Sequence, residues 1–237
     1  MADELRNDTT KPKKSLGAIT LAALIGAFIG ALFARPVIKP WLESHGPGFT
    51  VEDWPLFASF VPWILFSIYW EVQSKNSAPA VLSESKASRS VHVVLANLAL
   101  FLIMLPSKSL SHRFLPDALI VKLVGLAVEC SGLALAIWAR RVLGRNWSGE
   151  ITIKENHELI RSGPYRTVRH PIYSALLTMY AGTAIVSGQV HALIGLLLAI
   201  IAYLRKTRME EVNLVNAFGA SYDVYRKETW ALLPGLY

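Results

Sequence analysis

Long apolar stretches alternate with short polar ones along most of this chain. Six runs of between 15 and 22 mostly apolar residues stand out: 15–34, 55–70, 91–105, 118–139, 172–186 and 190–204. A transmembrane helix needs roughly 17–25 such residues. The pattern therefore predicts an all-α fold, a polytopic transmembrane helix bundle of about six spans.

The last two runs are separated only by residues 187–189, which predicts a C-terminal helical hairpin. Each arm has 15 residues, which is short for an upright crossing of a bilayer of ordinary thickness. Two readings stay open at this point. The bilayer thins around the hairpin, or the hairpin packs partly inside the bundle.

The polar stretches divide the chain into three parts: a disordered N-terminus at 1–14, four transmembrane helices over 15–139, and a final part over 140–237. Six spans place both ends of the chain on one side of the membrane. The four segments on that side are 1–14, 71–90, 140–170 and 205–237, and they hold 4, 3, 7 and 5 Lys or Arg, which is most of the 24 in the chain. Basic residues accumulate on the cytoplasmic side of membrane proteins. The distribution therefore predicts that the N-terminus, the C-terminus and the 140–170 loop are cytoplasmic.

Composition agrees with a membrane protein. The chain has 237 residues, of which 53% are hydrophobic, and its mean hydropathy is +0.38. A net charge of +7 is compatible with nucleic-acid binding, but its concentration in alternate loops favours membrane topology instead, and we expect no nucleic-acid partner. Cys130 is the only cysteine, so no disulfide within the chain and no cysteine-rich zinc site can form, and we expect no metal site.

A short polar connection at 161–173 precedes the hairpin. Gly163 and Pro164 indicate a turn, and Pro171 suits the first turn of a helix. Arg169 and His170 then lie where the chain enters the membrane, beside helix N-terminal N–H groups that favour anionic or zwitterionic ligands. Topology alone explains the arginines of this connection, but not a histidine, a glycine and two tyrosines in register with them.

Two further groups of residues are candidates for a chemical role. After the last apolar run, Lys206 and Glu210 lie one helical turn apart, as do Thr207 and Glu211. These residues form either a solvated helix face or a site whose carboxylates accept hydrogen bonds from ribose hydroxyls or an ammonium group. Glu129 lies in the middle of the fourth run, too far from Lys122 to pair with it. An ionisable group at that depth is expected to be functional, as part of a substrate pocket or a structural polar contact.

Together these residues resemble a known family. The chain reads His-x-Leu-Ile-x-x-Gly-Pro-Tyr-Arg-x-x-Arg-His-Pro-Ile-Tyr over 157–173, followed by Glu-Glu at 210–211, Phe-Gly at 218–219 and Tyr-x-x-Tyr at 222–225. The segment Leu-Gly-Arg-Asn-Trp-Ser at 143–148 fits the same pattern. In this order the motifs are similar to those of the isoprenylcysteine carboxyl methyltransferase and phospholipid methyltransferase family of membrane enzymes. The similarity covers about 125–237.

The resemblance implies that S-adenosylmethionine binds at the cytoplasmic ends of the last helices. The cofactor-binding residues that it implies are His157, Leu159, Gly163, Tyr165, His170, Pro171, Tyr173, Glu210 and Glu211. Family members often carry an arginine one turn before the paired glutamates, where this chain has Lys206. The cation that orients the substrate is therefore Lys206, Arg208 or Arg205, and Glu210 is a further catalytic candidate.

The implied activity is methyl transfer from S-adenosylmethionine to a lipophilic acceptor, such as the carboxylate of an isoprenylcysteine. We place this small-molecule or lipid acceptor near Glu129, Trp138 and Trp147, and membrane lipids surround the chain. Two alternatives are a phospholipid or amine N-methyltransferase and an NADPH-dependent membrane reductase of the sterol type, which carries a similar Arg-His-Pro-x-Tyr run. A non-catalytic membrane scaffold or transporter is a third.

Overall fold

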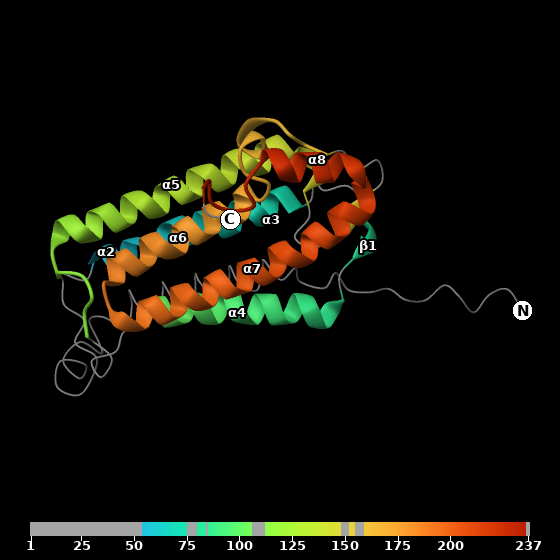
Figure 1. Ribbon diagram of the computed structural model, residues 1–237. Helices are drawn as coiled ribbons and strands as arrows, with labels where there is room; N and C mark the ends of the chain where they lie inside the picture. The colour runs from blue at the N-terminus through green and yellow to red at the C-terminus, as the bar shows by residue number, and fades with distance from the viewer. Residues whose placement is uncertain are drawn as a thin grey trace, which may run out of the picture.

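A computed structural model describes residues 54–74, 80–83, 85–105, 112–147, 152–154 and 159–235. The predicted span 15–34, the N-terminus 1–14 and His157 lie outside this part of the chain. Long helices run side by side in the described part (Figure 1). The α-helices of the described part are α2 (Trp54–Ala58), α3 (Phe60–Ser74), α4 (Lys86–Met104), α5 (Leu119–Leu143), α6 (Pro171–Ser187), α7 (Val190–Phe218) and α8 (Ala220–Glu228), of which α2 and α8 are short.

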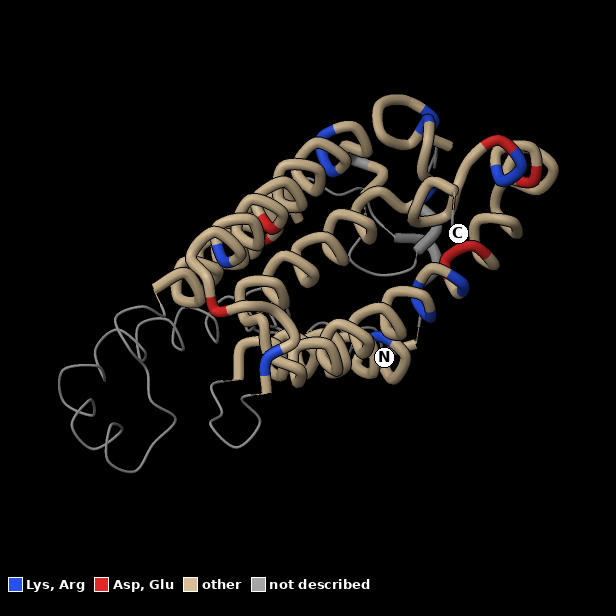
Figure 2. Tube along the Cα trace, turned by 60° about the vertical axis from the view of Figure 1, so that its left-hand side comes forward, with Lys and Arg blue, Asp and Glu red and all other residues tan. Residues whose placement is uncertain are grey.

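Four helical segments are long and apolar enough to cross a membrane: Trp54–Ser74, Ala87–Met104, Leu119–Leu143 and Val190–Phe218. Helix α6 is also apolar but has only 17 residues. These segments confirm the predicted all-α transmembrane bundle and its C-terminal hairpin, with α6 and α7 joined by the short turn after Ser187. The chain is an integral membrane protein, and most charged residues of the described part lie toward the ends of the helices (Figure 2).

Two features differ from the sequence expectation. The second hairpin arm does not end near residue 204, because α7 continues as one helix to Phe218 and ends at Gly219, whose φ is +52°. The acidic pair therefore lies on the same continuous helix as the second hairpin arm. The second feature is a small antiparallel sheet in which β1 (Ala80–Ser83) pairs with β2 (Thr152–Lys154). This sheet joins the polar loop between the second and third apolar runs to the 140–170 loop.

Helix α5 packs along α6 at very short range. A Cβ added to Gly182 of α6 would lie 2.5 Å from the backbone nitrogen of Glu129, and one added to Gly125 of α5 would lie 2.8 Å from the carbonyl oxygen of Gly182. Small residues at helix contacts allow this approach in membranes. In the same way α4 lies along α7 (Figure 1), where Gly195 faces the carbonyl oxygen of Ala99.

The turn between α6 and α7 closes one end of the bundle, which we call the hairpin end. Gly188 adopts a left-handed φ of +62° there, and its carbonyl oxygen accepts a hydrogen bond of 3.0 Å from the Phe114 N–H. The Val190 N–H donates to the carbonyl oxygen of His112 at 2.8 Å. Asp117 pairs with Lys122 at 2.7 Å nearby, so Lys122 is paired with a residue other than Glu129, as expected.

Candidate functional site

The opposite end of the bundle, which we call the motif end, carries the start of α6, the C-terminal half of α7, and α8. Just before α6, residues Gly163–Arg166 form a 3-10 turn. Gly163 has a φ of +59°, and a Cβ there would lie 2.9 Å from the Cγ2 of Val142, so this position requires glycine on both grounds. Pro171 begins α6 as predicted, since its missing N–H is not needed in the first turn.

The chain between this turn and α6 is hydrogen-bonded to the segment after α8. The Arg169 N–H donates to the carbonyl oxygen of Trp230 at 2.8 Å, and the Trp230 N–H donates to that of Thr167 at 3.1 Å. The His170 N–H donates to the carbonyl oxygen of Ala231 at 3.0 Å. The backbone on both sides of the His170 side chain is thus fixed before any ligand binds.

His170 connects the start of α6 to the acidic pair of α7. Its Nδ1 lies 3.5 Å from Oε2 of Glu210, and its Nε2 lies 3.4 Å from Oε1 of Glu211. Both distances exceed the usual range of hydrogen bonds, so the contacts are mainly ionic. The two sequence regions that we assigned to one ligand therefore meet, 40 residues apart in the chain, on the same side of the bundle.

These contacts determine the charge of the histidine. Burial on its own would lower the pKa of His170, but the carboxylates of Glu210 and Glu211 outweigh it and raise the pKa above the ordinary value. Arg169 adds a second cation, whose Nε donates to Oε1 of Glu211 at 2.8 Å. The site is thus a buried network of carboxylates and cations.

Arg169 is a member of this network that the sequence analysis left out of the cofactor-binding residues. Besides Glu211, its guanidinium reaches the carbonyl oxygens of Arg226 and Thr229, so one side chain links α6, α7 and the end of α8. Its position directly before His170 in the motif is the signal that could have identified it.

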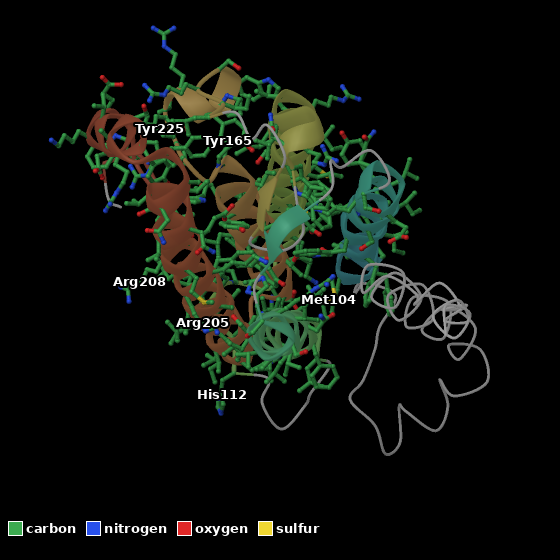
Figure 3. The ribbon with its side chains drawn as sticks, turned by 90° about the vertical axis from the view of Figure 1, so that its right-hand side faces the viewer. Met104, His112, Tyr165, Arg205, Arg208 and Tyr225 are labelled. Carbon is green, nitrogen blue, oxygen red and sulfur yellow. The ribbon has the colours of Figure 1, made fainter. Side chains whose placement is uncertain are left out.

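Aromatic rings surround the histidine. The ring of Tyr173 lies parallel to that of His170, with centroids 5.6 Å apart, and Tyr203 of α7 is 5.4 Å from Tyr173. On the other side of the turn, the Tyr225 hydroxyl donates to the carbonyl oxygen of Tyr165 at 2.6 Å, and the two residues lie close together at one end of the molecule (Figure 3). Burial raises the pKa of Tyr225 to about 12, so this hydroxyl stays protonated and can donate.

The three candidate cations of α7 have different environments. Lys206 is only 6% exposed and lies within electrostatic range of Glu210. Arg205 donates to the hydroxyl of Ser88 on α4 at 3.0 Å. Arg208 is exposed and points away from the bundle (Figure 3). Because Arg208 lies on the outer face of α7, we do not retain it as a cation that orients the substrate.

The three residues predicted to line a substrate pocket are not together. Glu129 is fully buried between α5 and α6, about 16 Å along the helix axis from Arg140 at the motif end. Trp138 is 52% exposed. Trp147 is buried, and the guanidinium of Arg140 lies 4.5 Å above its ring. Only Trp147 therefore combines burial with a position next to the motif end.

The remaining residues that we predicted to bind the cofactor belong to the segment around the same turn. Tyr165 and Pro171 are buried and Leu159 is partly buried, whereas His157 lies outside the described residues. Among the described residues, no group of three His, Cys, Asp or Glu side chains is placed to hold a metal ion. The geometry of the motif end favours a polar organic ligand that carries both hydroxyl or ammonium groups and flat or apolar parts.

Residues 120–221 match the family model described as phospholipid methyltransferase. Over these residues the chain is similar to phospholipid methyltransferases, which supports the resemblance drawn from its motifs. The matched region begins at the second residue of α5 and ends at the second residue of α8, so most of α8, the segment after it and strand β1 lie outside the match.

Individual relatives are named as methyltransferases as well. The chain is 32% identical over 112 residues to a protein of Schizosaccharomyces pombe named protein-S-isoprenylcysteine O-methyltransferase, covering 46% of this chain and 48% of that protein. It is 28% identical over 85 residues to a protein of the same name in Dictyostelium discoideum, covering 35% and 36%. A probable enzyme of this name from Oryza sativa is 30% identical over 117 residues, covering 48% and 61%. The chain thus matches between about a third and three fifths of the length of these relatives.

Proposed function

We propose that this protein is an integral membrane methyltransferase that uses S-adenosylmethionine to methylate a lipophilic acceptor. The observation that carries the proposal is the contact of His170 with both Glu210 and Glu211, which joins the motif turn to α7. The protein-S-isoprenylcysteine O-methyltransferase names of the relatives support the carboxylate of an isoprenylcysteine-like molecule as the acceptor. The phospholipid methyltransferase description of the family model makes a lipid amine the second acceptor to test.

The residues at the motif end fit this cofactor. The hydroxyl of Tyr222, within electrostatic range of Glu210 and Glu211, is buried and has no hydrogen-bond partner among the described residues. Such atoms are costly unless a ligand or water satisfies them, and a carboxylate accepts hydrogen bonds from ribose hydroxyls or an α-ammonium group. The stacked rings of His170 and Tyr173 offer a flat apolar surface, and the faces of Tyr173 and Tyr203 attract a positively charged sulfonium.

When bound, S-adenosylmethionine supplies a methyl group on a sulfonium, which passes to the acceptor oxygen as the carbon–sulfur bond electrons return to sulfur. A carboxylate acceptor is already ionised, so no residue of the chain has to remove a proton. The chain instead has to align the two molecules and exclude water. We assign the orienting role to Lys206, which is buried on the Glu210 face of α7. An amine or thiol acceptor would need a base, and we propose Glu210 for that role.

The basic loops support a cytoplasmic location of the motif end, where a water-soluble donor can reach the site. A lipophilic acceptor then enters sideways from the bilayer between helices. The proposal is tested with the purified full-length chain in detergent or nanodiscs and methyl-labelled S-adenosylmethionine. Three acceptor panels should be offered: prenylated cysteines, phospholipids and small lipophilic acids. Transfer to a prenylcysteine carboxylate is the expected result. Stabilisation by NADPH instead of S-adenosylmethionine would favour the reductase alternative and contradict the proposal.

A further inference from the structure

A second buried cation lies at the motif end, outside the network of His170. Arg140, in the last turn of α5, is 2% exposed. Its Nη1 donates to the carbonyl oxygen of Gly144 at 2.6 Å, and its Nη2 donates to that of Gln73 at the end of α3 at 2.7 Å. The indole ring of Trp147 lies 4.5 Å below the guanidinium.

This guanidinium lacks a counter-ion in the described part of the chain. A buried charge that is not paired with an opposite charge is strongly disfavoured. Backbone carbonyls and an aromatic face offset part of that cost, but the Nε of Arg140 is buried with no hydrogen-bond partner. The hydroxyl of Tyr69, within electrostatic range of the guanidinium, is likewise buried without one. Two hydrogen-bond donors without a partner, the Nε–H of Arg140 and the hydroxyl of Tyr69, thus lie within electrostatic range of each other.

The position of this pair relates it to the cofactor residues. Tyr165, in the motif turn, lies within electrostatic range of both Arg140 and Glu210. The Arg140 region and the acidic pair therefore flank one tyrosine, at the end of the bundle where α3 and α5 end together (Figure 1). Trp147 and Trp70 close the region with an edge-to-face contact of 5.9 Å between their rings.

We propose that Arg140 and Tyr69 form a binding site for a carboxylate, with the Nε of Arg140 donating to one oxygen and the Tyr69 hydroxyl to the other. The proposal rests on the function proposed above, because that reaction brings two carboxylates to the motif end. One belongs to the methionine part of S-adenosylmethionine, and the other belongs to the acceptor. Among the described residues, Arg140 is a buried cation with no carboxylate partner, whereas Lys206 lies within electrostatic range of Glu210.

The variants are Tyr69→Phe and Arg140→Gln, and Arg141→Gln is the matched control. Tyr69→Phe keeps the ring and removes only the hydroxyl, so it does not depend on whether Arg140→Gln folds. Arg141 is the next residue on α5 but is exposed. Loss of a hydrogen bond to a charged group should weaken binding roughly tenfold in Tyr69→Phe, and loss of the charge roughly a hundredfold in Arg140→Gln. Arg141→Gln should bind as the unchanged chain does.

Four ligands distinguish the two sources of the carboxylate, and their binding to the full-length protein is measured without turnover. They are N-acetyl-S-farnesylcysteine, its carboxamide, S-adenosylmethionine and decarboxylated S-adenosylmethionine. If the site holds the acceptor, Tyr69→Phe weakens the farnesyl acid but not its amide. If it holds the donor, the variant weakens S-adenosylmethionine but not the decarboxylated form. Either result supports the carboxylate site.

Unchanged affinity of Tyr69→Phe for both acids, with an equal or higher melting temperature, would overturn the inference and leave the proposed function intact. That outcome would make Arg140 a purely structural residue. Failure of the unchanged chain to bind S-adenosylmethionine or the farnesyl acid would instead overturn both the proposed function and the carboxylate site. The binding data of the unchanged chain therefore separate the two failures.

Discussion

The helix pair α5 and α6 is held together differently at its middle and at the motif end. In the middle, Gly125 and Gly182 bring the two backbones together, and the contact is dominated by packing of small residues. At the motif end, the start of α6 is held by ion pairs of Arg169 and His170 and by backbone hydrogen bonds to the segment after α8. Packing fixes where the helices run, whereas the polar network fixes the side chains that can act on a ligand.

Glu129 is the exception within the middle region. Its carboxyl group is fully buried, and Ser59 and Thr183 lie beside it. No described cation pairs with it, in contrast to the acidic pair of α7. Burial of an ionisable side chain is therefore not enough to make it part of the candidate site. What separates Glu210 and Glu211 from Glu129 is the presence of histidine and arginine partners.

Replacing residues of the polar network should have the largest effect. Glu210→Gln and His170→Ala are each expected to abolish binding of S-adenosylmethionine, because each removes a charge from a buried network. Equilibrium binding of the labelled cofactor to purified variants checks this. Asp223→Asn is the control, since it neutralises an exposed carboxylate on α8. Retained binding in both variants would show that this network does not hold the cofactor.

Enlarging a glycine of the middle region should reduce stability instead. In Gly182→Leu the new side chain would collide with the backbone of Glu129, and overpacking of this kind costs about 3 kcal/mol. We expect a lower melting temperature of the whole bundle. Ala134→Leu introduces the same side chain on an exposed part of α5 and should change little. Equal melting temperatures of the two variants would argue against close packing at this seam.

The pH dependence of stability should come from the motif end. The pKa of His170 is raised in the folded protein, so its ion pairs contribute fully below the unfolded value of about 6.5 and are lost as the pH rises through the folded value. The melting temperature should therefore fall as the pH is raised above about 6.5. His170→Asn should remove this part of the fall. An identical pH profile in the variant would mean that other groups cause it.

The smallest effect is expected for a single hydrogen bond at the edge of the network. Tyr225→Phe removes the bond to the carbonyl oxygen of Tyr165 and should cost about 1 kcal/mol. Chemical denaturation of the two proteins measures this difference. The carbonyl of Tyr165 is buried, so a variant as stable as the original would imply that water or another donor replaces the hydroxyl.

The sequence was sufficient to predict the apolar helices and most residues of the motif end. Apolar runs located the described spans, Pro171 marked the start of α6, and the paired glutamates identified the partner of the motif. The last apolar run ends at 204, where charged residues begin, so the run alone did not predict that α7 continues without a break to Phe218. Charge argues against burial in lipid but not against helix, and this part of α7 is held by its ion pairs instead.

Features that depend on distant partners could not be predicted from one segment. The pairing of β1 with β2 joins residues about 70 positions apart, and neither strand has a pattern of its own. The burial of Lys206 and the exposure of Arg208 follow from the rotation of α7 about its axis, which is set by packing against α4 and α6. Tyr69 and Arg140 meet only because α3 and α5 end at the same level.

The central claim is that the turn before α6 and the acidic pair of α7 hold one molecule of S-adenosylmethionine. Photochemical cross-linking of the radiolabelled cofactor to the full-length protein, followed by peptide mapping, tests it most directly. The account predicts label in a peptide within 159–173 and in a peptide that contains Glu210 and Glu211, and unlabelled S-adenosylmethionine should displace both. Label confined to one of them, or label elsewhere in the bundle, would contradict it.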